Sequence, residues 1–408
     1  MGVQIDLEPS KIIKPNLFPK SEIKNIKLFY ILSALNNAWF AEANWFFVWL
    51  RFMTASQLGL LDAAVFAYGL LIEIPSGAVA DLIGKKKSIV AAMFLSGLGI
   101  MFMSFGQEYI HFAIGFIIAQ TGWALYSGAA EAFAYDSLVE KNEENSYEKV
   151  ISASSSINRI VTVITIFVGG FLYAWYFKAP HFAWGLAAFI GAIIACGLTE
   201  PKIDTIKFSF KNYLAQLKDG GKSLFNERLK FFIFIIVALL GGDFMFNWGI
   251  IKPAAGAMFG FMENTQALLF PAFIMISALT VKFIPQMRKI FTDKQGLFLL
   301  TSLMGFGYLI SGLPLGHFGI IPLFIIIFAG SLAYPWLSIV VNREIDSKHR
   351  ATALSTVALL AKLPYVILAI VAGKMIQKEQ LPLFMTWVGL AILLSVALTF
   401  ILKKIKTK

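Results

Sequence analysis

Long apolar stretches follow one another along almost the whole chain, separated by short polar segments. A helix needs about 20 mostly apolar residues to cross the hydrocarbon core of a bilayer. Breaks at charged residues, prolines and glycines divide the pattern into stretches of this length. We therefore predict twelve membrane-spanning helices, at Leu28–Leu50, Gln57–Ala80, Ser88–Gly106, Ile110–Tyr135, Val150–Trp175, Phe182–Leu198, Phe231–Ile251, Gln266–Phe283, Leu297–Pro314, Phe318–Val341, Ala351–Gly373 and Leu381–Leu402.

A long basic segment separates the sixth predicted span from the seventh. Two groups of six helices around such a linker are typical of internally duplicated secondary transporters. We expect an all-α membrane protein with twelve transmembrane helices in two six-helix halves. Its parts would be an N-terminal tail (1–27), a first half (28–198), a linker (199–230), a second half (231–402) and a C-terminal tail (403–408).

The composition supports a membrane protein. Hydrophobic residues make up 58% of the chain and charged residues 14%, against about 25% charged residues in ordinary soluble domains. A soluble protein has too few polar groups here to cover that apolar surface. The single cysteine, Cys196, excludes a disulfide framework, and the four histidines show no metal-ligand spacing. We expect no metal site and no cofactor.

The positive net charge of +11 is spread over the segments between apolar stretches, so it indicates a bilayer rather than a nucleic acid as partner. Of the lysines and arginines, 28 lie on one side of the predicted spans, five lie on the other side, and two lie within spans. Cytoplasmic segments carry such an excess. We therefore predict a multi-pass protein of the cell inner membrane with both termini in the cytoplasm. The sequence predicts no oligomeric state.

One loop carries a recognisable motif. Gly77 is followed four residues later by Asp81, and then by Gly84, Lys85 and Lys86, between the second and third spans. This pattern resembles the loop signature of the major facilitator superfamily. The stretch from Glu73 to Gly77 and the stretch from Ser127 to Ser137 also resemble that family's second and fourth helices. The glycine–proline signature common in the fifth helix of its antiporters is missing, and Gly169 and Gly170 stand there instead.

The resemblance implies that this loop is part of a gate. Asp81 would face the N-terminus of the eleventh helix, near Ala351–Thr356, where the helix dipole favours a negative charge. Lys85 would pair with Asp136 at the end of the fourth helix. We expect Gly77 and Gly84 to permit close approach and a tight turn, and these contacts to hold the two halves together in one state. The alternative is that the lysines, Lys86 among them, only set topology.

Six charged residues lie within predicted spans: Glu42, Glu73, Glu131, Arg159, Asp243 and Lys362. A charge at the bilayer centre costs at least ~2.5 kcal/mol, so we expect these side chains to face a shared cavity or one another. Burial makes the charged form of a carboxyl group costly, and such groups can exchange protons near neutral pH. Glu42 is our first candidate for proton coupling, with Lys362 as a partner, and Asp243 is the second. Pairing for structural reasons alone is the alternative.

Aromatic residues accompany Glu42 in the first span. Trp39, Trp45 and Trp49 follow helical spacing, and Phe46 is close in sequence. An acid among aromatic rings suits a lipophilic cation through charge and cation–π attraction. We therefore include Trp39, Trp45 and Phe46 in a candidate substrate site, and place Trp49 in the interfacial aromatic belt.

These features favour a secondary active transporter that moves a small-molecule substrate by alternating access. We prefer proton-coupled efflux of lipophilic or cationic compounds, because the predicted cavity is acidic and aromatic. The missing antiporter signature favours the alternative, proton-coupled uptake of a metabolite. A membrane enzyme acting on lipid-linked substrates would need a cluster of acids, histidines or metal ligands at one face, and the sequence shows none. A channel has no use for a gate motif.

Overall fold

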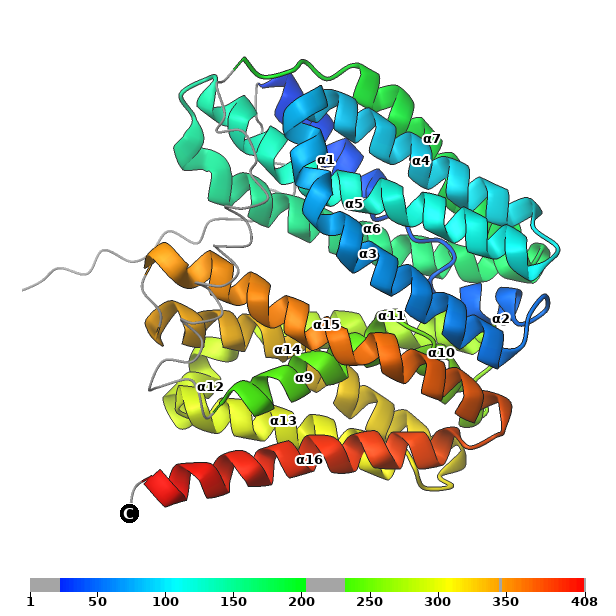
Figure 1. Ribbon diagram of the computed structural model, residues 1–408, viewed down its shortest axis with the longest axis vertical. Helices are drawn as coiled ribbons and strands as arrows, with labels where there is room; N and C mark the ends of the chain where they lie inside the picture. The colour runs from blue at the N-terminus through cyan, green and yellow to red at the C-terminus, as the bar shows by residue number, and fades with distance from the viewer. Residues whose placement is uncertain (1–22, 203–231, 345–346, 407–408) are drawn as a thin grey trace, which may run out of the picture.

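The computed structural model describes residues 23–202, 232–344 and 347–406 (Figure 1). Within these ranges the side chains of Ile74, 342–355, Ala358 and 403–406 are not described. All regular structure in the described part of the chain is helical. The first half contains α1 (Lys24–Asn36), α2 (Trp45–Trp49), α3 (Ala55–Ile83), α4 (Lys85–Phe105), α5 (Tyr109–Val139), η1 (Glu144–Ser146), α6 (Tyr147–Trp175) and α7 (Ala179–Cys196).

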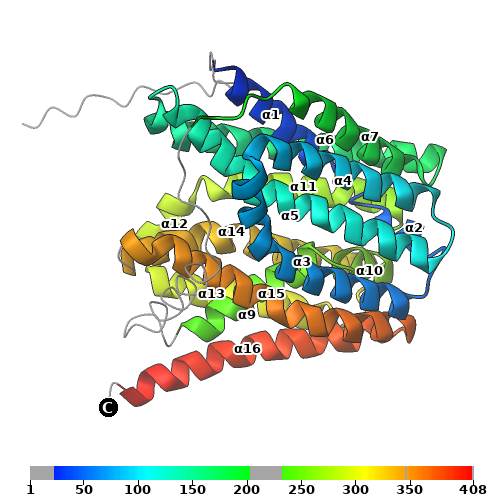
Figure 2. The same cartoon turned by 45° about the horizontal axis from the view of Figure 1, so that its top comes forward.

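The second half repeats this arrangement of long helices. It contains α9 (Ile233–Asn247), α10 (Ile251–Met258), α11 (Glu263–Val281), α12 (Ile284–Ile290), α13 (Asp293–Ile310), η2 (Gly316–Gly319), α14 (Ile320–Glu344), α15 (Ser347–Gln377) and α16 (Leu381–Lys406). Figures 1 and 2 show the two halves as two bundles lying side by side, with α3 and α15 between them. We call the end where α1 begins and α16 ends the terminal face, and the end where α3 begins and α15 ends the distal face.

The predicted architecture of two six-helix halves is confirmed, although not every helix has the predicted length. Nine helices of the described residues are long and apolar enough to cross a membrane, and the bent pair α9 and α10 adds a tenth. Two further helices complete the layout. α1 has only 13 residues, and α13 begins with the polar residues Asp293, Lys294 and Gln295.

The first predicted span, Leu28–Leu50, is not one helix. The chain is irregular at residues 37–44, between α1 and α2. Irregular backbone at membrane depth must find hydrogen bonds within the protein, and α6 supplies them: Thr162 Oγ1 donates to the carbonyl of Asn37 at 3.0 Å, and Asn44 Nδ2 donates to the carbonyl of Gly169 at 3.2 Å. A Cβ on Gly169 would lie 1.8 Å from the carbonyl oxygen of Phe40, so only glycine lets this segment pack there.

The seventh predicted span, Phe231–Ile251, is also broken. α9 ends at Asn247 and α10 starts at Ile251 with a bend of 68° between them. Phe231 lies outside the described residues. The Lys252 Nζ at the start of α10 donates to the carbonyl of Asn247 at 3.3 Å and so satisfies an acceptor that the bend leaves without a helical partner.

The buried apolar residues form a large core that joins the two halves, a smaller core that does not, and a small cluster of Ala43, Ile166 and Ala267 that also joins them. The larger core combines distal residues of the first half, such as Leu58 and Leu61, with residues throughout the second half. The smaller core contains only first-half residues near the terminal face, among them Ile26, Phe133 and Leu198. The halves therefore share a dry interface near the distal face and are separately packed near the terminal face.

Candidate functional site

The interface between the halves is closest near the distal face, where α3 crosses α15. A Cβ on Gly59 would lie 2.5 Å from the carbonyl oxygen of Ala369 and 2.8 Å from the Cα of Gly373. The backbone N–H of Ser56 donates to Gln377 Oε1 at 3.2 Å in the same region. On the other side of the interface, a Cβ on Gly170 of α6 would lie 2.8 Å from the Cβ of Ala267 on α11. Small residues thus allow both helix pairs to pack closely.

Glu42 makes an ion pair across this interface, but not with the expected partner. Its Oε1 lies 2.9 Å from the Nζ of Lys252, a residue that the hydrophobic pattern places in a loop outside the spans. The predicted pairing with Lys362 is wrong because Glu42 lies in the irregular segment after α1, which places it at the bend between α9 and α10. The Lys252 side chain is 7% exposed and that of Glu42 is 23% exposed. The pair therefore links the halves in a largely dehydrated setting.

The aromatic residues near Glu42 contribute to the same contact. Trp39 packs edge-on against Trp248 of the second half, with ring centroids 5.4 Å apart. Trp45 contacts Trp49 at 5.2 Å and Phe46 at 6.3 Å. The predicted helical face of tryptophans is wrong, because the segment is not a continuous helix.

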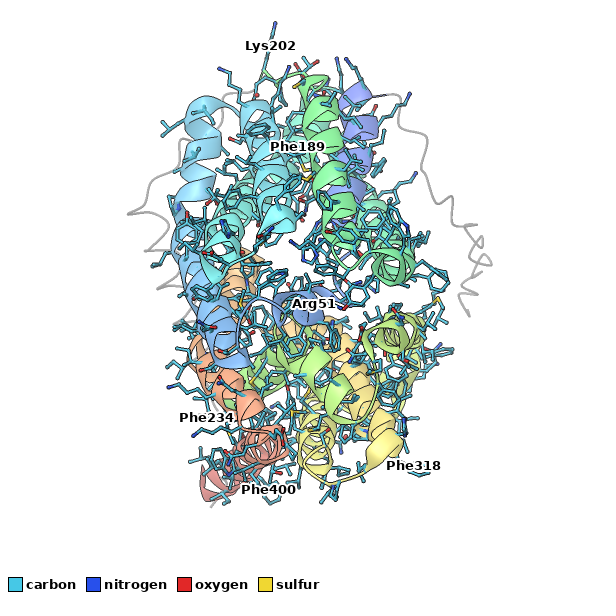
Figure 3. The ribbon with its side chains drawn as sticks, turned by 90° about the vertical axis from the view of Figure 1, so that its right-hand side faces the viewer. Arg51, Phe189, Lys202, Phe234, Phe318 and Phe400 are labelled. Carbon is cyan, nitrogen blue, oxygen red and sulfur yellow. The ribbon has the colours of Figure 1, made fainter. Side chains whose placement is uncertain are left out.

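Trp49 is buried and donates to His181 Nε2 at 3.1 Å, so it belongs to the core rather than to an interfacial belt. Figure 3 views the distal face and shows Arg51, two residues after Trp49, at the boundary between the halves.

Two further predicted charges meet across the interface on the terminal side of Glu42. The Nζ of Lys362 on α15 lies 3.8 Å from Oε2 of Glu73 on α3. Their side chains are 33% and 48% exposed, so the pair is long and partly hydrated. An exposed pair of this kind contributes at most about 1 kcal/mol.

Asp243 is held within the second half. Its Oδ1 accepts a hydrogen bond from Asn247 Nδ2 at 2.7 Å, one turn further along α9. A Cβ on Gly330 of α14 would lie 1.8 Å from the same oxygen. Glycine at 330 therefore makes room for a carboxylate between α9 and α14, and Asp243 has no contact with Glu42.

Asp62, which is 1% exposed, is not among the site residues expected from the sequence. Tyr365 of α15 donates its hydroxyl hydrogen to Asp62 Oδ2 across the interface. Asp62 escapes prediction because it lies near the predicted start of its span, where a charge can reach water. The feature that could have indicated burial of Asp62 is its position within a helix of 29 residues, which is long enough for its early turns to be buried. Three acids of the first half, Glu42, Asp62 and Glu73, thus each contact a residue of the second half.

A polar pocket of about 260 Å³ lies within the first half, between α1, α5 and α6. Glu131 is its single charged residue and is exposed. Ser154 Oγ donates to Ser33 Oγ at 2.8 Å, and Ser33 Oγ lies 3.0 Å from the Asn158 side-chain amide. Arg159, predicted to share a cavity with the acids, is exposed and does not line this pocket. The lining residues are Phe29, Ser33, Asn37, Tyr126, Ser127, Ala130, Glu131, Ile151, Ser154, Ser155 and Asn158.

The predicted ion pair between Lys85 and Asp136 is present at the terminal face. Both side chains are about nine-tenths buried. The pair joins α4 to α5, so it lies inside the first half and does not connect the halves directly, contrary to the expectation from the sequence. Glu200 makes a second set of contacts here. Its Oε1 and Oε2 accept hydrogen bonds from the backbone N–H groups of Lys85 and Lys86 at 2.7 and 2.8 Å. A carboxylate at this position stabilises the N-terminus of α4.

The two motif glycines have different roles. Gly84 has a φ of +98°, a conformation that favours glycine, and it forms the turn between α3 and α4. A Cβ on Gly77 would meet no atom within 4 Å, so the expected close approach is wrong for this residue. Gly128 of α5 provides that approach instead, since a Cβ there would lie 2.9 Å from the Gly77 nitrogen. Asp81 is exposed, and most of the residues expected to face it, 351–355, are outside the described side chains.

In the part of the chain that the structure describes, no group of three or more His, Cys, Asp or Glu side chains is arranged to hold a metal ion. The contacts described above are ion pairs and hydrogen bonds of carboxyl groups. The arrangement combines acids between the two halves with a polar pocket in one of them.

Comparisons with known proteins agree with this geometry. The family model of the Major Facilitator Superfamily matches residues 26–369. A curated relative, multidrug resistance protein MdtH of Blochmanniella pennsylvanica (strain BPEN), is 25% identical over 209 residues. That match covers 51% of this chain and 47%, about half, of the relative's length.

Solved structures share the fold at low sequence identity. The nucleoside transporter NupG superposes with a TM-score of 0.70 at 14% identity, covering 94% of this chain and 98% of NupG. A bacterial homologue of the human lysosomal transporter Spinster, in an inward-facing and unoccupied conformation, gives a TM-score of 0.64 at 15% identity over 92% of this chain and 95% of its own. The POT family transporter PepTSo gives 0.68 at 12% identity over 95% and 98%.

Proposed function

The chain belongs to the major facilitator superfamily, and on this premise we propose that it exports small lipophilic or cationic organic compounds in exchange for protons. The protein is a multi-pass membrane transporter and not an enzyme. The observation that carries proton exchange is that Glu42, Asp62 and Glu73 each contact the other half. Transport by alternating access requires such contacts to break and re-form. Adding a proton to a carboxyl group changes the strength of each contact, so protons can bias this step.

The terminal face is the cytoplasmic face in this proposal, as the lysine and arginine bias predicts. The distal face is then external, and the structure corresponds to a state closed to the outside. Asp81, the Lys85–Asp136 pair and Glu200 would rearrange when the cytoplasmic side closes. Glu42 and Asp243 remain candidates for proton coupling, and Trp39, Trp45 and Phe46 line the external closure in this proposal rather than a substrate site in the cavity.

The polar pocket supports a positively charged substrate. Glu131 supplies a negative charge with no basic residue among the lining side chains, and hydroxyl and amide groups nearby accept and donate hydrogen bonds. The pocket volume of about 260 Å³ is smaller than the cavities that enclose whole drug-sized ligands, which are about 300–1,000 Å³. It would therefore hold the charged group of a substrate, while the rest of the substrate lies between the halves.

The purified protein in liposomes with an acidic lumen should accumulate ethidium, a lipophilic cation, and a protonophore should abolish the accumulation. Glu131→Gln should raise the KM for ethidium about tenfold or more, because a hydrogen bond or contact to a charged group contributes about 1.5–3 kcal/mol. Glu143→Gln, an exposed acid beyond the end of the same helix, is the matched control and should leave the KM unchanged. Ethidium uptake that ignores the gradient would contradict proton exchange, and an unchanged KM in Glu131→Gln would contradict the pocket assignment.

Proton-coupled uptake of a metabolite is the second candidate. It is favoured by the absence of the antiporter glycine–proline signature and by the many uncharged polar groups of the pocket. The same liposomes separate the two functions. A symporter accumulates its solute when the lumen is alkaline, whereas an antiporter does so when the lumen is acidic.

The motif loop provides a separate test. Asp81→Asn should cut transport about tenfold without changing thermal stability, because Asp81 is exposed and acts only in the state closed at the terminal face. Asp136→Asn should lower both transport and the melting temperature, because it leaves the buried Lys85 without its partner. Lys85→Glu combined with Asp136→Lys should recover part of both losses. Wild-type transport by Asp81→Asn would refute the gating role.

A further inference from the structure

Asp62 differs from the other two acids that connect the halves. Glu42 and Glu73 face lysines, Lys252 and Lys362, whereas the partner of Asp62 is the uncharged hydroxyl of Tyr365. Asp62 and Tyr365 are each 1% exposed. A carboxylate buried without a basic partner is costly, whereas the protonated form is not.

The surroundings of the pair are apolar and tightly packed. The Tyr365 ring contacts Phe66 of α3 and Phe244 of α9, with centroids 5.0 and 5.5 Å away, and these two phenylalanines contact each other at 5.4 Å. A Cβ on Gly249 would lie 1.6 Å from the Tyr365 hydroxyl oxygen. The hydroxyl therefore lies against the bend between α9 and α10, at the meeting point of both halves.

No other ionisable side chain interacts with Asp62 among the described residues. From α15 the facing group is Tyr365, and α9 contributes the uncharged Phe244 through its contact with that tyrosine. Ionisable groups near the pair are Lys362 of α15, Asp243 of α9 and Tyr308 of α13, which bond Glu73, Asn247 and the carbonyl of Gly242. An ionised Asp62 would thus have no cation to balance its charge among the residues that the structure describes.

We propose that Asp62 is the proton-binding carboxyl group that controls closure of the distal face, with Tyr365 as the residue that positions it. This inference rests on the proposed proton exchange and names the residue responsible. The neutral carboxylic acid fits the dry interface and keeps its hydrogen bond to Tyr365, so proton binding favours the closed state. Loss of the proton leaves a charge in the interface, and separation of α3 from α15 lets water reach it.

In this proposal, the proton bound at Asp62 leaves toward the terminal face by way of Lys362 and Glu73. Lys362 precedes Tyr365 by three residues on α15, so their side chains are neighbours on one helix face, and both approach Phe244. Glu73 lies beyond, 3.8 Å from Lys362 and partly exposed. In exchange transport, a proton bound at Asp62 from the distal side would close that face and leave through this partly hydrated pair.

The test measures distal opening and transport together. A cysteine at Ser56, in a Cys196→Ser background, reports opening by its labelling rate with a membrane-impermeant maleimide. Labelling in the wild-type background, after correction for the pH dependence of the thiol–maleimide reaction itself, should be slow at acidic pH and at least several-fold faster at alkaline pH. Asp62→Asn mimics the protonated acid, so labelling should stay slow at every pH and gradient-driven ethidium transport should fall at least tenfold. Tyr365→Phe should remain pH-dependent but label faster than wild type at every pH, because the closed state loses its hydrogen bond.

Matched variants separate this role from loss of structure. Tyr308→Phe removes another buried hydroxyl, which bonds the carbonyl of Gly242 within the second half, and Asp293→Asn changes an acid that pairs with Arg288 within that half. Both should keep the wild-type pH response. Wild-type transport that is independent of the proton gradient would contradict the proposed function. Gradient-driven wild-type transport together with an unchanged pH response in Asp62→Asn would instead overturn this inference. If Asp62→Asn does not fold, a Tyr365→Phe protein that labels at the wild-type rate at every pH overturns it.

Discussion

Gly59→Leu should reduce transport to less than about a tenth of the wild-type rate while the protein stays folded. A Cβ at this position would already lie 2.5 Å from the carbonyl oxygen of Ala369 on the opposite helix, and leucine adds three more carbon atoms. Forcing extra carbon atoms into a packed contact costs about 1–3 kcal/mol. Each 1.4 kcal/mol changes a population about tenfold, so the state closed at the distal face would become rare and the transport cycle would stall.

The measurement is ethidium transport in liposomes, paired with labelling of a cysteine at Gln377 to detect a distal face that stays open. Ala64→Leu is the matched control, because Ala64 lies five residues further on the same helix and is exposed. It should transport and label like the wild type. A Gly59→Leu protein that transports at the wild-type rate would mean that α3 and α15 do not need this contact.

The second large effect concerns the ion pair between Glu42 and Lys252. Glu42→Gln removes the ion-pair partner of the Lys252 ammonium group, which is 7% exposed. Breaking a buried pair costs about 3–5 kcal/mol, and the partial exposure of Glu42 places this pair toward the lower end. We expect transport to fall about tenfold or more. Glu42→Gln combined with Lys252→Gln should recover most of it, because two amides can hydrogen-bond without a buried charge.

The double variant also decides between two roles for Glu42. If Glu42 only seals the distal face, the double variant keeps its dependence on the proton gradient. If Glu42 is the coupling acid, the double variant transports ethidium downhill but loses that dependence, and the assignment to Asp62 is then wrong. Arg288→Gln breaks an ion pair with Asp293 inside the second half and should leave both transport and coupling unchanged.

Hydrophobic patterning predicts the helices well because each membrane span must satisfy its own backbone hydrogen bonds. It fails at residues 37–44, where apolar composition continues although Thr162 and Gly169 of another helix provide the hydrogen bonds. Apolarity reports the environment of a segment and not its backbone conformation. The interaction of Lys85 with Asp136 was predictable only through the family resemblance, since it depends on how α4 and α5 pack.

Partners across the interface are harder to predict. Asp62 and Tyr365 are 303 residues apart in the chain, and nothing in the local sequence of either residue points to the other. The same holds for Glu42 and Lys252, which meet because two spans are broken at the same depth. An acid in an apolar helix can be identified from the sequence as unusual, but its partner follows only from the packing of the two halves.

The closest contact between α3 and α15 lies near one end of each helix, so a small rotation about it displaces the other end of each helix by a larger distance. Gly59 lies near one end of α3, so the 24 residues from there to Ile83 extend about 36 Å at 1.5 Å per residue. A rotation of about 10° around that point displaces the far end by about 6 Å, roughly the width of an aromatic ring. In the proposed alternating access, a rotation of this size about the glycine contact would set the width of the opening at the terminal face.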